Sequence, residues 1–477
     1  MGKRKVLIIG LDCLTPQFTF DQFLQDLPNI KGLMDRGYWG PLRSTDPPIT
    51  IPAWSSMMTS KDPGQLGFYG FRNRKDFSYD ALYFANSLAV KEPTVWNILS
   101  RNRLDSVLVG IPQTYPPKPL RGHMVTGFLA PDTQSNFTYP EELKAEVEKV
   151  TNGYIIDVKD FRTDNKEWLV KQVYEMTEKR FRLIRHFLKT KPWDFFMCVE
   201  MGPDRLHHGF WRYCDREHRL YEPGNAFENV LRDYYTYIDT QVGDILSEVN
   251  IDETIVFIVS DHGAKRMEGG ICVNEWLQQE GYLTLKERPK AIARLKMDAI
   301  DWSRTRVWGE GGYYSRLFFN VQGREPQGLI PQHDYEHTRS ELIEKLEHLG
   351  DEHGIPIGTA VHRPQNLYRA CNNIAPDLIV YFGDLNWRSV GSIGTGAVHT
   401  FENDTGPDDA NHDYHGVLIM ADPDIPGALR GQNLKGTTLL DIAPTVLERL
   451  GIKPPADMLG RVIATAEGEP AKAKGER

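Results

Sequence analysis

Short apolar runs rich in β-branched residues constrain the fold of this chain more than any other feature. Runs that are apolar on both faces are typical of buried strands in parallel sheets. The segments between them have apolar residues at helical spacing. Alternation of this kind predicts an α/β fold, a three-layer sandwich around a mostly parallel central sheet. The six predicted strands are Val6–Leu11, Ser106–Ile111, Phe195–Glu200, Ile255–Ser260, Leu378–Phe382 and Val417–Ala421.

The length of 477 residues, with 40% hydrophobic and 25% charged residues, allows a large core with an added subdomain. The charge-rich segment 265–364 interrupts the alternation, and we interpret it as an inserted cap subdomain. The catalytic core is then formed by residues 1–264 and 365–464. The polar, small-residue segment 465–477 has the composition of a disordered tail.

The net charge and the cysteine content limit the binding partners and the cellular compartment that we expect for the protein. The net charge of −9 gives no basic surface for a nucleic-acid polymer. We expect no membrane span, because no apolar run approaches about 18 residues. Five cysteines without a CxxC pair are read as reduced residues of a cytoplasmic protein. The sequence leaves the oligomeric state open.

Candidate metal ligands follow two of the predicted strands. Asp261 and His262 come directly after the run Ile255–Ser260, and Asp12 closes the run Val6–Leu11. Parallel α/β sheets place their functional residues at the carboxyl ends of strands, and Asp and neutral His both ligate metals. The alternative for a carboxylate at such a place is a helix cap or a loop contact.

Two further segments carry histidines at useful spacing. Asp204 and His208 are four residues apart, so they share one face of a helix and could bind one ion. His207 is also within reach, and spacing alone leaves the choice open. His412 and His415 precede the last predicted strand. The alternative for all four histidines is a solvated surface or loop.

Thr50 has the environment that a nucleophile needs. Pro52 fits the first turn of a helix, which places Thr50 at or just before the helix start. The free N–H groups and the positive end of the helix dipole would then favour an alkoxide at its hydroxyl. The alternative role is that of an ordinary helix N-cap.

Taken in order, these segments resemble the alkaline phosphatase superfamily, in its type I phosphodiesterase/nucleotide pyrophosphatase-like branch. The resemblance extends over nearly the whole chain and looks closest to a group of predicted phosphohydrolases or phosphomutases. Its motifs are Thr50-x-Pro-Ala-Trp, Thr59-Ser-Lys-Asp-Pro63-Gly, Asp204…His208-x-x-Trp211, Ser260-Asp-His-Gly263, Ala375-Pro-Asp-Leu-Ile-Val380 and Asp441-Ile-Ala-Pro-Thr445.

The resemblance implies an alkaline phosphatase-like fold and two metal ions. One ion would be held by Asp204, His208 and His412, with His415 as the fallback ligand. The other would be held by Asp12, Asp261 and His262, and Thr50 would be both its ligand and the nucleophile. Ligands of Asp and His without Cys suit Zn²⁺, and Mn²⁺ is a second option.

The chain departs from the family at one position that matters for substrate binding. The phosphate-binding Asn of the family falls on Phe71. We expect Arg72 and Asn73, the next residues, to bind the substrate instead. Arg205, Lys265 and Arg266 are further candidate cations near the ligands, although solvated surface charge is their commoner role.

The function that follows is a two-metal phosphoric-ester hydrolase, similar to phosphodiesterases and nucleotide pyrophosphatases, which acts on a small phosphorylated substrate. Thr50 would form a phosphothreonine intermediate. A phosphomutase or phosphomonoesterase with the same metal site is the first alternative. A non-catalytic metal-binding protein is the alternative from another class.

Overall fold

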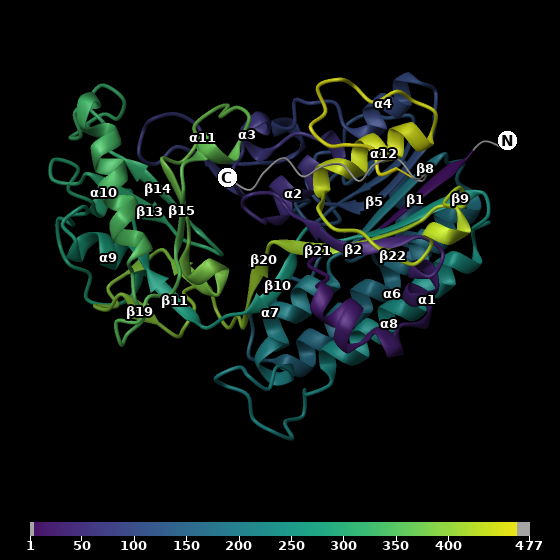
Figure 1. Cartoon of the computed structure of the whole chain (residues 1–477), viewed down its shortest axis with the longest axis horizontal. Coiled ribbons are helices and arrows are strands. Elements are labelled where there is room, and N and C mark those ends of the chain that lie inside the picture. The colour runs from purple at the N-terminus through teal and green to yellow at the C-terminus, as the bar shows by residue number, and fades with distance from the viewer. Residues whose placement is uncertain (1–3, 465–477) are drawn as a thin grey trace.

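The computed structural model describes residues 4–464 (Figure 1). The predicted tail 465–477 lies outside the described residues. The centre of the fold is a ten-stranded mixed sheet, ordered β22-β2-β21-β9-β1-β8-β5-β6-β7, with β23 beside β2. Its five middle strands run parallel, and they are β9 (Thr254–Val259), β1 (Lys5–Leu11), β8 (Phe195–Glu200), β5 (Ser106–Ile111) and β6 (Gly122–Thr126).

The flanks of this sheet are not parallel throughout. β21 (His415–Ala421) pairs antiparallel with both β9 and β2 (Tyr38–Arg43). The prediction of a parallel strand at Val417–Ala421 is therefore wrong in direction. Helices cover both faces of the sheet, so a strand of either direction is apolar on both sides there. The remaining strands of the sheet are short: β7 (Thr138–Tyr139), β22 (Gln432–Asn433) and β23 (Thr437–Thr438).

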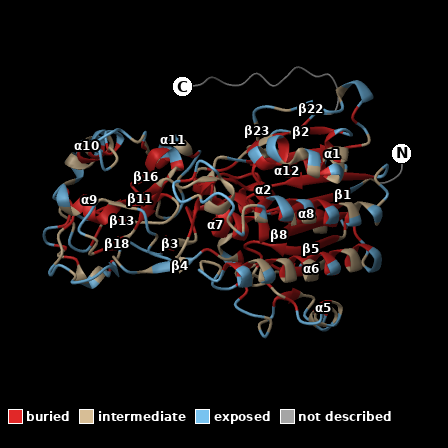
Figure 2. Cartoon of the chain, turned by 90° about the horizontal axis from the view of Figure 1, so that it is seen from below, coloured by how far each residue is buried: buried red, intermediate tan, exposed pale blue. Residues whose placement is uncertain are grey.

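Helices cover the two faces of the sheet and complete three layers (Figure 1). One face carries α1 (Pro28–Met34), α6 (Lys166–Thr190), α7 (Gly202–Cys214) and α8 (Val230–Ser247), and the other carries α2 (Thr50–Thr59), α4 (Val95–Arg101) and α12 (Ile442–Arg449). The strands between them are buried, whereas the helices expose their outer sides (Figure 2). The predicted three-layer α/β fold with a mostly parallel central sheet is confirmed.

A smaller body, called here the second lobe (residues 269–400), has its own apolar cluster, which runs from Ile271 to Ile393. Its main sheet is antiparallel, with β13 (Val307–Glu310), β14 (Ser315–Phe319), β16 (Leu378–Tyr381) and β15 (Ala360–His362) in that order. The run Leu378–Phe382, predicted as a parallel strand of the central sheet, is thus an antiparallel strand of this lobe. The predicted cap limits, 265 and 364, stay a prediction.

The other elements of the second lobe pack around this sheet. They are β11 (Gly269–Cys272), α9 (Val273–Gln279), β12 (Ala293–Arg294), α10 (Tyr335–Glu347), α11 (Pro364–Leu367), β17 (Trp387–Val390), β18 (Ser392–Ile393) and β19 (His399–Thr400). Outside the lobe lie α3 (Pro63–Leu66), the hairpin of β3 (Arg72–Arg74) and β4 (Leu82–Phe84), α5 (Leu143–Thr151), and the ribbon of β10 (Gly263–Arg266) and β20 (Ala410–Asp413).

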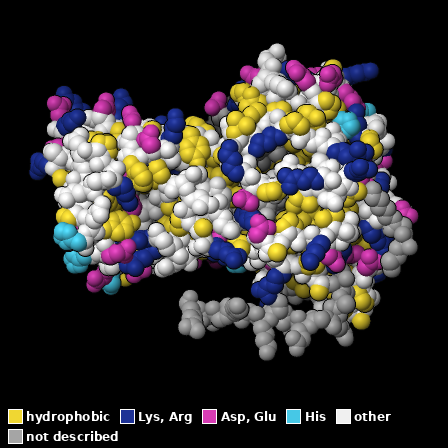
Figure 3. Space-filling view, turned by 90° about the horizontal axis from the view of Figure 1, so that it is seen from above, with side chains coloured by type: hydrophobic (Ala, Val, Ile, Leu, Met, Phe, Trp, Pro, Cys, Tyr) yellow, Lys and Arg dark blue, Asp and Glu magenta, His cyan; other side chains and the backbone are white. Residues whose placement is uncertain are grey.

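The surface carries charges of both signs, and the cysteines form no disulfide within residues 4–464. Basic and acidic side chains are interspersed over the face drawn in Figure 3. All five cysteines are free, and Cys13, Cys198 and Cys272 are buried. Among residues 4–464, no helix combines the length and the apolar character that a membrane crossing requires.

Candidate metal centre

Seven predicted site residues converge where the middle strands of the sheet end. Because β9, β1 and β8 are adjacent and parallel, the residues that follow them meet at one edge. The loop after β9, the end of β1 and the start of α7 supply five of the seven, and α2 and β20 supply the others. All seven are at most 4% exposed: Asp12, Thr50, Asp204, His208, Asp261, His262 and His412.

The first group joins the ends of β1 and β9. One ligand atom each of Asp12, Asp261 and His262 lies within 4.8 Å of the others. Nε2 of His262 is 3.3 Å from Oδ2 of Asp261 and 3.8 Å from Oδ1 of Asp12. Oγ1 of Thr50 lies 3.2 Å from the same nitrogen. This group could therefore hold one metal ion next to the Thr50 hydroxyl.

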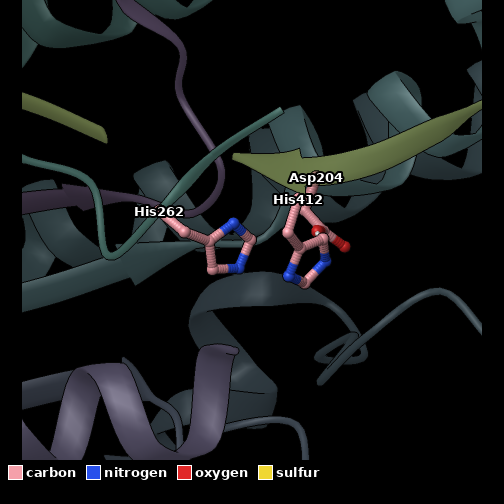
Figure 4. A group of neighbouring side chains, drawn as sticks. All are labelled: Asp204, His262 and His412. Carbon is pink, nitrogen blue, oxygen red and sulfur yellow. Dashed lines mark ion pairs between the residues drawn. The ribbon is translucent and has the colours of Figure 1, made fainter. Parts of the chain in front are cut away.

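The second group joins α7 and β20. Oδ1 of Asp204 lies 3.2 Å from Nε2 of His208 and 3.8 Å from Nε2 of His412. The two histidine nitrogens are 3.3 Å apart. Ligand atoms of Asp204, His262 and His412 also lie within 4.8 Å of one another (Figure 4). His262 thus lies between the two groups, with its ring stacked on that of His412 at 3.8 Å.

The three histidines are oriented alike, with Nδ1 toward an oxygen acceptor and Nε2 toward the centre. Each engages an oxygen acceptor through Nδ1: His208 with Oδ1 of Asp408 at 2.7 Å, His262 with the Gly263 carbonyl at 3.0 Å, and His412 with the Pro48 carbonyl at 2.8 Å. A proton on Nδ1 leaves the lone pair of Nε2 free in the neutral ring. Every Nε2 faces the centre, which is the arrangement of metal-binding histidines.

In each of the three carboxylates, one oxygen accepts a hydrogen bond and the other is left for a cation at the centre. Oδ1 of Asp12, Oδ1 of Asp204 and Oδ2 of Asp261 are buried and have no hydrogen-bond donor among residues 4–464. The second oxygen of each is held by Nε1 of Trp54, by Arg205 or by the amide of Cys13, respectively. Unpaired buried charge is costly, so this set of oxygens and nitrogens fits divalent cations.

The pKa shifts of the proposed ligands also agree with the binding of divalent cations. Burial raises the pKa of Asp12, and repulsion from Asp261 and Asp204 raises it further. Burial likewise raises the pKa of Asp261. Burial lowers the pKa of His262 to about 4. These shifts mean that the pocket, without a cation, disfavours the carboxylate charges that a metal ion would stabilise.

The pKa values of Asp204 and His208 shift in opposite directions. Burial alone would raise the pKa of Asp204, but His208 and Arg205 outweigh it, and that pKa lies well below its ordinary value. The pKa of His208 is raised to about 9, because Asp408 and Asp204 outweigh the effect of burial. A proton on Nε2 of His208 therefore competes with a metal ion for the same position.

The alternative histidines lie outside the centre. Nε2 of His207 is 3.0 Å from the hydroxyl of Tyr235, and its ring packs against Phe18 and Trp211. His415 is exposed at the first residue of β21. The structure thus brings His208 and His412, and not their neighbours, to the carboxylates.

Thr50 is the first residue of α2, and the N-cap position belongs to Ile49. The side-chain hydroxyl of Thr50 is therefore not used as a cap. It contacts His262 instead, at 3.2 Å, and it lies at the end of the helix where backbone N–H groups are free. The N-cap alternative for Thr50 is excluded by this geometry.

The two predicted substrate-binding residues lie in different environments. Oδ1 of Asn73 accepts from the Tyr69 amide at 2.7 Å, and its Nδ2 donates to the Gly70 carbonyl at 2.9 Å. Both ends of this amide hold the local turn, and a substrate contact of Asn73 stays a prediction. Arg72 lines the cavity described below.

Of the other candidate cations, only Arg205 reaches the ligands, through Asp204. Nζ of Lys265 donates to the Asp384 carbonyl at 2.9 Å. Arg266 pairs with three carboxylates away from the centre, those of Asp215, Glu217 and Glu268.

A cavity of about 500 Å³ opens onto Thr50, Asp204 and His412. Part of its wall is aromatic and part is cationic. The aromatic residues are Phe71, Phe84, Phe128, Phe161, Tyr313 and Tyr314, and the arginines are Arg72, Arg162, Arg205, Arg316 and Arg388. Tyr313, Tyr314, Arg316 and Arg388 belong to the second lobe, so the cavity lies between the two bodies of the molecule.

Sequence reasoning missed three residues that shape the centre. Asp408 binds His208 and also accepts from Arg162 and Arg388, each at 2.8 Å. The Tyr313 ring stacks on His412 at 3.9 Å. Trp54, which holds Asp12, was inside a recognised motif and could have been found there. Asp408 and Tyr313 had no such signal, because they share no motif with the histidines they contact.

Comparison with known proteins gives one family and several structural neighbours. Residues 6–414 match the family model described as type I phosphodiesterase / nucleotide pyrophosphatase, a metal-dependent family. Human ectonucleotide pyrophosphatase/phosphodiesterase 5 is 12% identical, with a TM-score of 0.55 and coverage of 95% of this chain and 96% of that chain. The murine protein of the same name is 10% identical, with a TM-score of 0.54 and coverage of 94% and 96%.

An inactive murine variant in complex with AMP is also similar, with 10% identity, a TM-score of 0.53 and coverage of 94% and 96%. At these identities the structural likeness shows the fold. None of the curated proteins compared with the chain matches it.

Proposed function

The chain belongs to the type I phosphodiesterase / nucleotide pyrophosphatase family, and on this premise we propose that it is a two-metal phosphoric-ester hydrolase with Thr50 as the nucleophile. One observation carries the proposal. Three buried carboxylate oxygens, which have no donor within the described residues 4–464, and three histidine Nε2 atoms face one another beside the Thr50 hydroxyl.

The residues divide into two ligand sets. Asp12, Asp261 and His262 would hold the ion next to Thr50. Asp204, His208 and His412 would hold the other. The donor set of oxygen and nitrogen without sulfur favours Zn²⁺, with Mn²⁺ as the second option. When bound, the ions supply positive charge for the phosphoryl oxygens and for the attacking and leaving oxygens.

The chain's own groups account for the rest of the reaction. Oγ1 of Thr50 attacks phosphorus, so the Oγ–P bond forms, the ester P–O bond breaks, and the alcohol leaves with the proton that Thr50 gives up. Water then cleaves the phosphothreonine and restores the hydroxyl. Asp408 keeps the His208 ring in the orientation that its Nδ1 contact sets.

A small phosphorylated substrate of nucleotide type fits this proposal. The murine neighbour binds AMP in a structure described as inactive, in which a threonine is replaced by alanine. The aromatic wall of the cavity offers a face for an apolar ester group. The cytoplasmic location and the absence of nucleic-acid and membrane partners stay predictions.

A phosphomutase or phosphomonoesterase remains the second candidate, and the arginines around the cavity favour it. A monoester carries two charges near neutral pH where a diester carries one, and guanidinium groups bind such anions well. The difference between the two candidates lies in the substrate, since the ligands and the nucleophile are the same.

Turnover of bis-p-nitrophenyl phosphate and p-nitrophenyl phosphate by the metal-loaded protein tests the proposal. We expect Thr50→Ala to abolish turnover and Thr50→Ser to retain part of it. Thr59→Ala is the matched control, because Thr59 is buried in the same helix and its hydroxyl donates to the Ser55 carbonyl. Full activity of Thr50→Ala would rule out the nucleophile. A clear preference for the monoester would favour the second candidate.

A further inference from the structure

Five arginines line the cavity beside Thr50, and four of them have acidic partners. Arg162 and Arg388 share the carboxylate of Asp408. Arg205 binds Asp157 through two of its nitrogens and also contacts Asp204. Arg316 pairs with Glu310. These four guanidinium groups line the cavity, and neighbouring carboxylates hold each of them in place.

Arg72 differs from the other four. Within residues 4–464 its guanidinium makes no hydrogen bond and no ion pair. The side chain is nevertheless partly buried. Burial lowers the pKa of Arg72, and the nearby charges of Arg294 and Arg316 lower it further, while Glu310 opposes them. A partly desolvated cation beside two others is costly unless an anion joins it.

The backbone of Arg72 is fixed although its side chain is not. Its carbonyl accepts from Arg316, and β3 pairs with β4, with Arg72 opposite Phe84. The side-chain amide of Asn73 fixes the turn that precedes β3, because it accepts from the Tyr69 amide and donates to the Gly70 carbonyl. The cation is thus presented from a rigid hairpin, so an anion that binds it need not order the backbone.

Arg72 and the metal ligands lie on different parts of the cavity wall. The charges that act most on Arg72 are those of Glu310, Arg294, Arg316 and Asp404. The charges that act most on Arg205 include Asp204 and Asp12. Arg205 therefore lies next to the proposed ligand Asp204, whereas Arg72 lies next to Arg316 of the second lobe.

We propose that Arg72 binds a second anionic group of the substrate, a phosphate or a carboxylate, in addition to the phosphoryl group that Thr50 attacks. The inference rests on the proposed function and specifies its substrate class. The planar guanidinium suits bidentate contact with either anion. Ester groups without charge would contact the aromatic wall but would leave Arg72 without a partner.

Three 4-nitrophenyl phosphodiesters test this inference with the metal-loaded protein. The second ester group is ethyl, 2-carboxyethyl or 2-phosphonoethyl, so all three release the same nitrophenolate. We expect kcat/KM for at least one anionic ester to exceed that for the ethyl ester by about 10-fold or more, the effect of a charge-assisted hydrogen bond. The better anionic ester identifies the group as carboxylate or phosphate.

Variants of the hairpin give the decisive comparison. Arg72→Gln should lower kcat/KM for the anionic ester by about 10-fold more than kcat/KM for the ethyl ester, and Arg72→Lys should keep part of the preference. Lys75→Gln is the matched control, because Lys75 is an exposed cation on the same hairpin and does not line the cavity. Turnover of the ethyl ester reports that each variant is folded.

Two results would overturn the inference: no anionic preference in the unmodified protein, or an unchanged preference in Arg72→Gln. Calorimetric binding of the same esters to metal-loaded Thr50→Ala and to Thr50→Ala with Arg72→Gln makes the comparison without turnover. Retained ethyl-ester turnover in Thr50→Ala would count against the proposed function and not against this inference.

Discussion

At the scale of single residues, Asp408 is not a proposed metal ligand, but it orients one of them, His208. Its Oδ1 binds Nδ1 of His208 at 2.7 Å, and its Oδ2 joins Arg162 and Arg388. Asp408→Asn keeps the size of the side chain but removes the charge. We expect metal affinity to fall by about 10- to 100-fold, as for other groups that orient a metal-binding histidine.

Metal titration followed by calorimetry measures this change. Asp404→Asn is the control, because Asp404 loses the same charge and, in the part of the chain that the structure describes, its carboxylate accepts only from Ser392. Equal metal affinity in Asp408→Asn and the unmodified protein would contradict the prediction.

At the scale of elements, α7 separates two neighbouring histidines by function. His208 faces the carboxylates, and His207 faces Tyr235 in the core. His207→Ala should lower the free energy of unfolding by about 1–3 kcal/mol, because the buried Tyr235 hydroxyl keeps the Thr15 amide but loses its contact with the His207 ring. The variant should still bind two metal ions, whereas His208→Ala should bind one tightly.

Thermal unfolding and metal analysis of the two variants separate these effects. The control is Thr177→Val, which changes a buried hydroxyl on α6 away from the ligands. A loss of metal in His207→Ala, or two tightly bound ions in His208→Ala, would show that the division of roles on α7 is wrong.

The elements also show what the sequence could predict. The proposed ligands Asp12, Asp261 and Asp204 could be placed together from the sequence because they follow β1, β9 and β8, whose ends meet in a parallel sheet. The directions of β21 and β16 were not found, since a strand covered on both faces is apolar whichever way it runs. The family and the enzyme class are confirmed. The identity of the substrate remained open, because Arg72 was expected at the site but the cavity wall around it includes Tyr313, which only folding brings there.

At the scale of the whole molecule, we expect the candidate metal centre to couple folding to cation binding. The three ligand carboxylates are buried near one another, and burial raises the pKa of Asp12 and Asp261. A raised carboxyl pKa gives stability that is present below the unfolded value of about 3.9 and is lost as the pH rises through the folded pKa. The protein without metal should therefore be less stable at pH 8 than at pH 5.

Chelation followed by thermal unfolding at both pH values checks this expectation. Metal removal should lower Tm at pH 8 by more than at pH 5, and added Zn²⁺ should restore it, because a ligand at about 100 times its Kd stabilises the folded state by about 2.7 kcal/mol. The variant Asp12→Asn should show a smaller dependence on pH after chelation. An identical Tm with and without metal would contradict the coupling.

The position of the cavity between the two bodies has a consequence for how this protein can diversify. Every proposed metal ligand lies outside residues 269–400, whereas Tyr313, Tyr314, Arg316 and Arg388 of the opposite wall lie within them. Part of the cavity wall that would choose the substrate is thus encoded in a stretch of the chain that carries none of the proposed metal ligands. Exchange of the segment 311–316 between relatives would alter which esters are accepted while the machinery that breaks them is inherited unchanged.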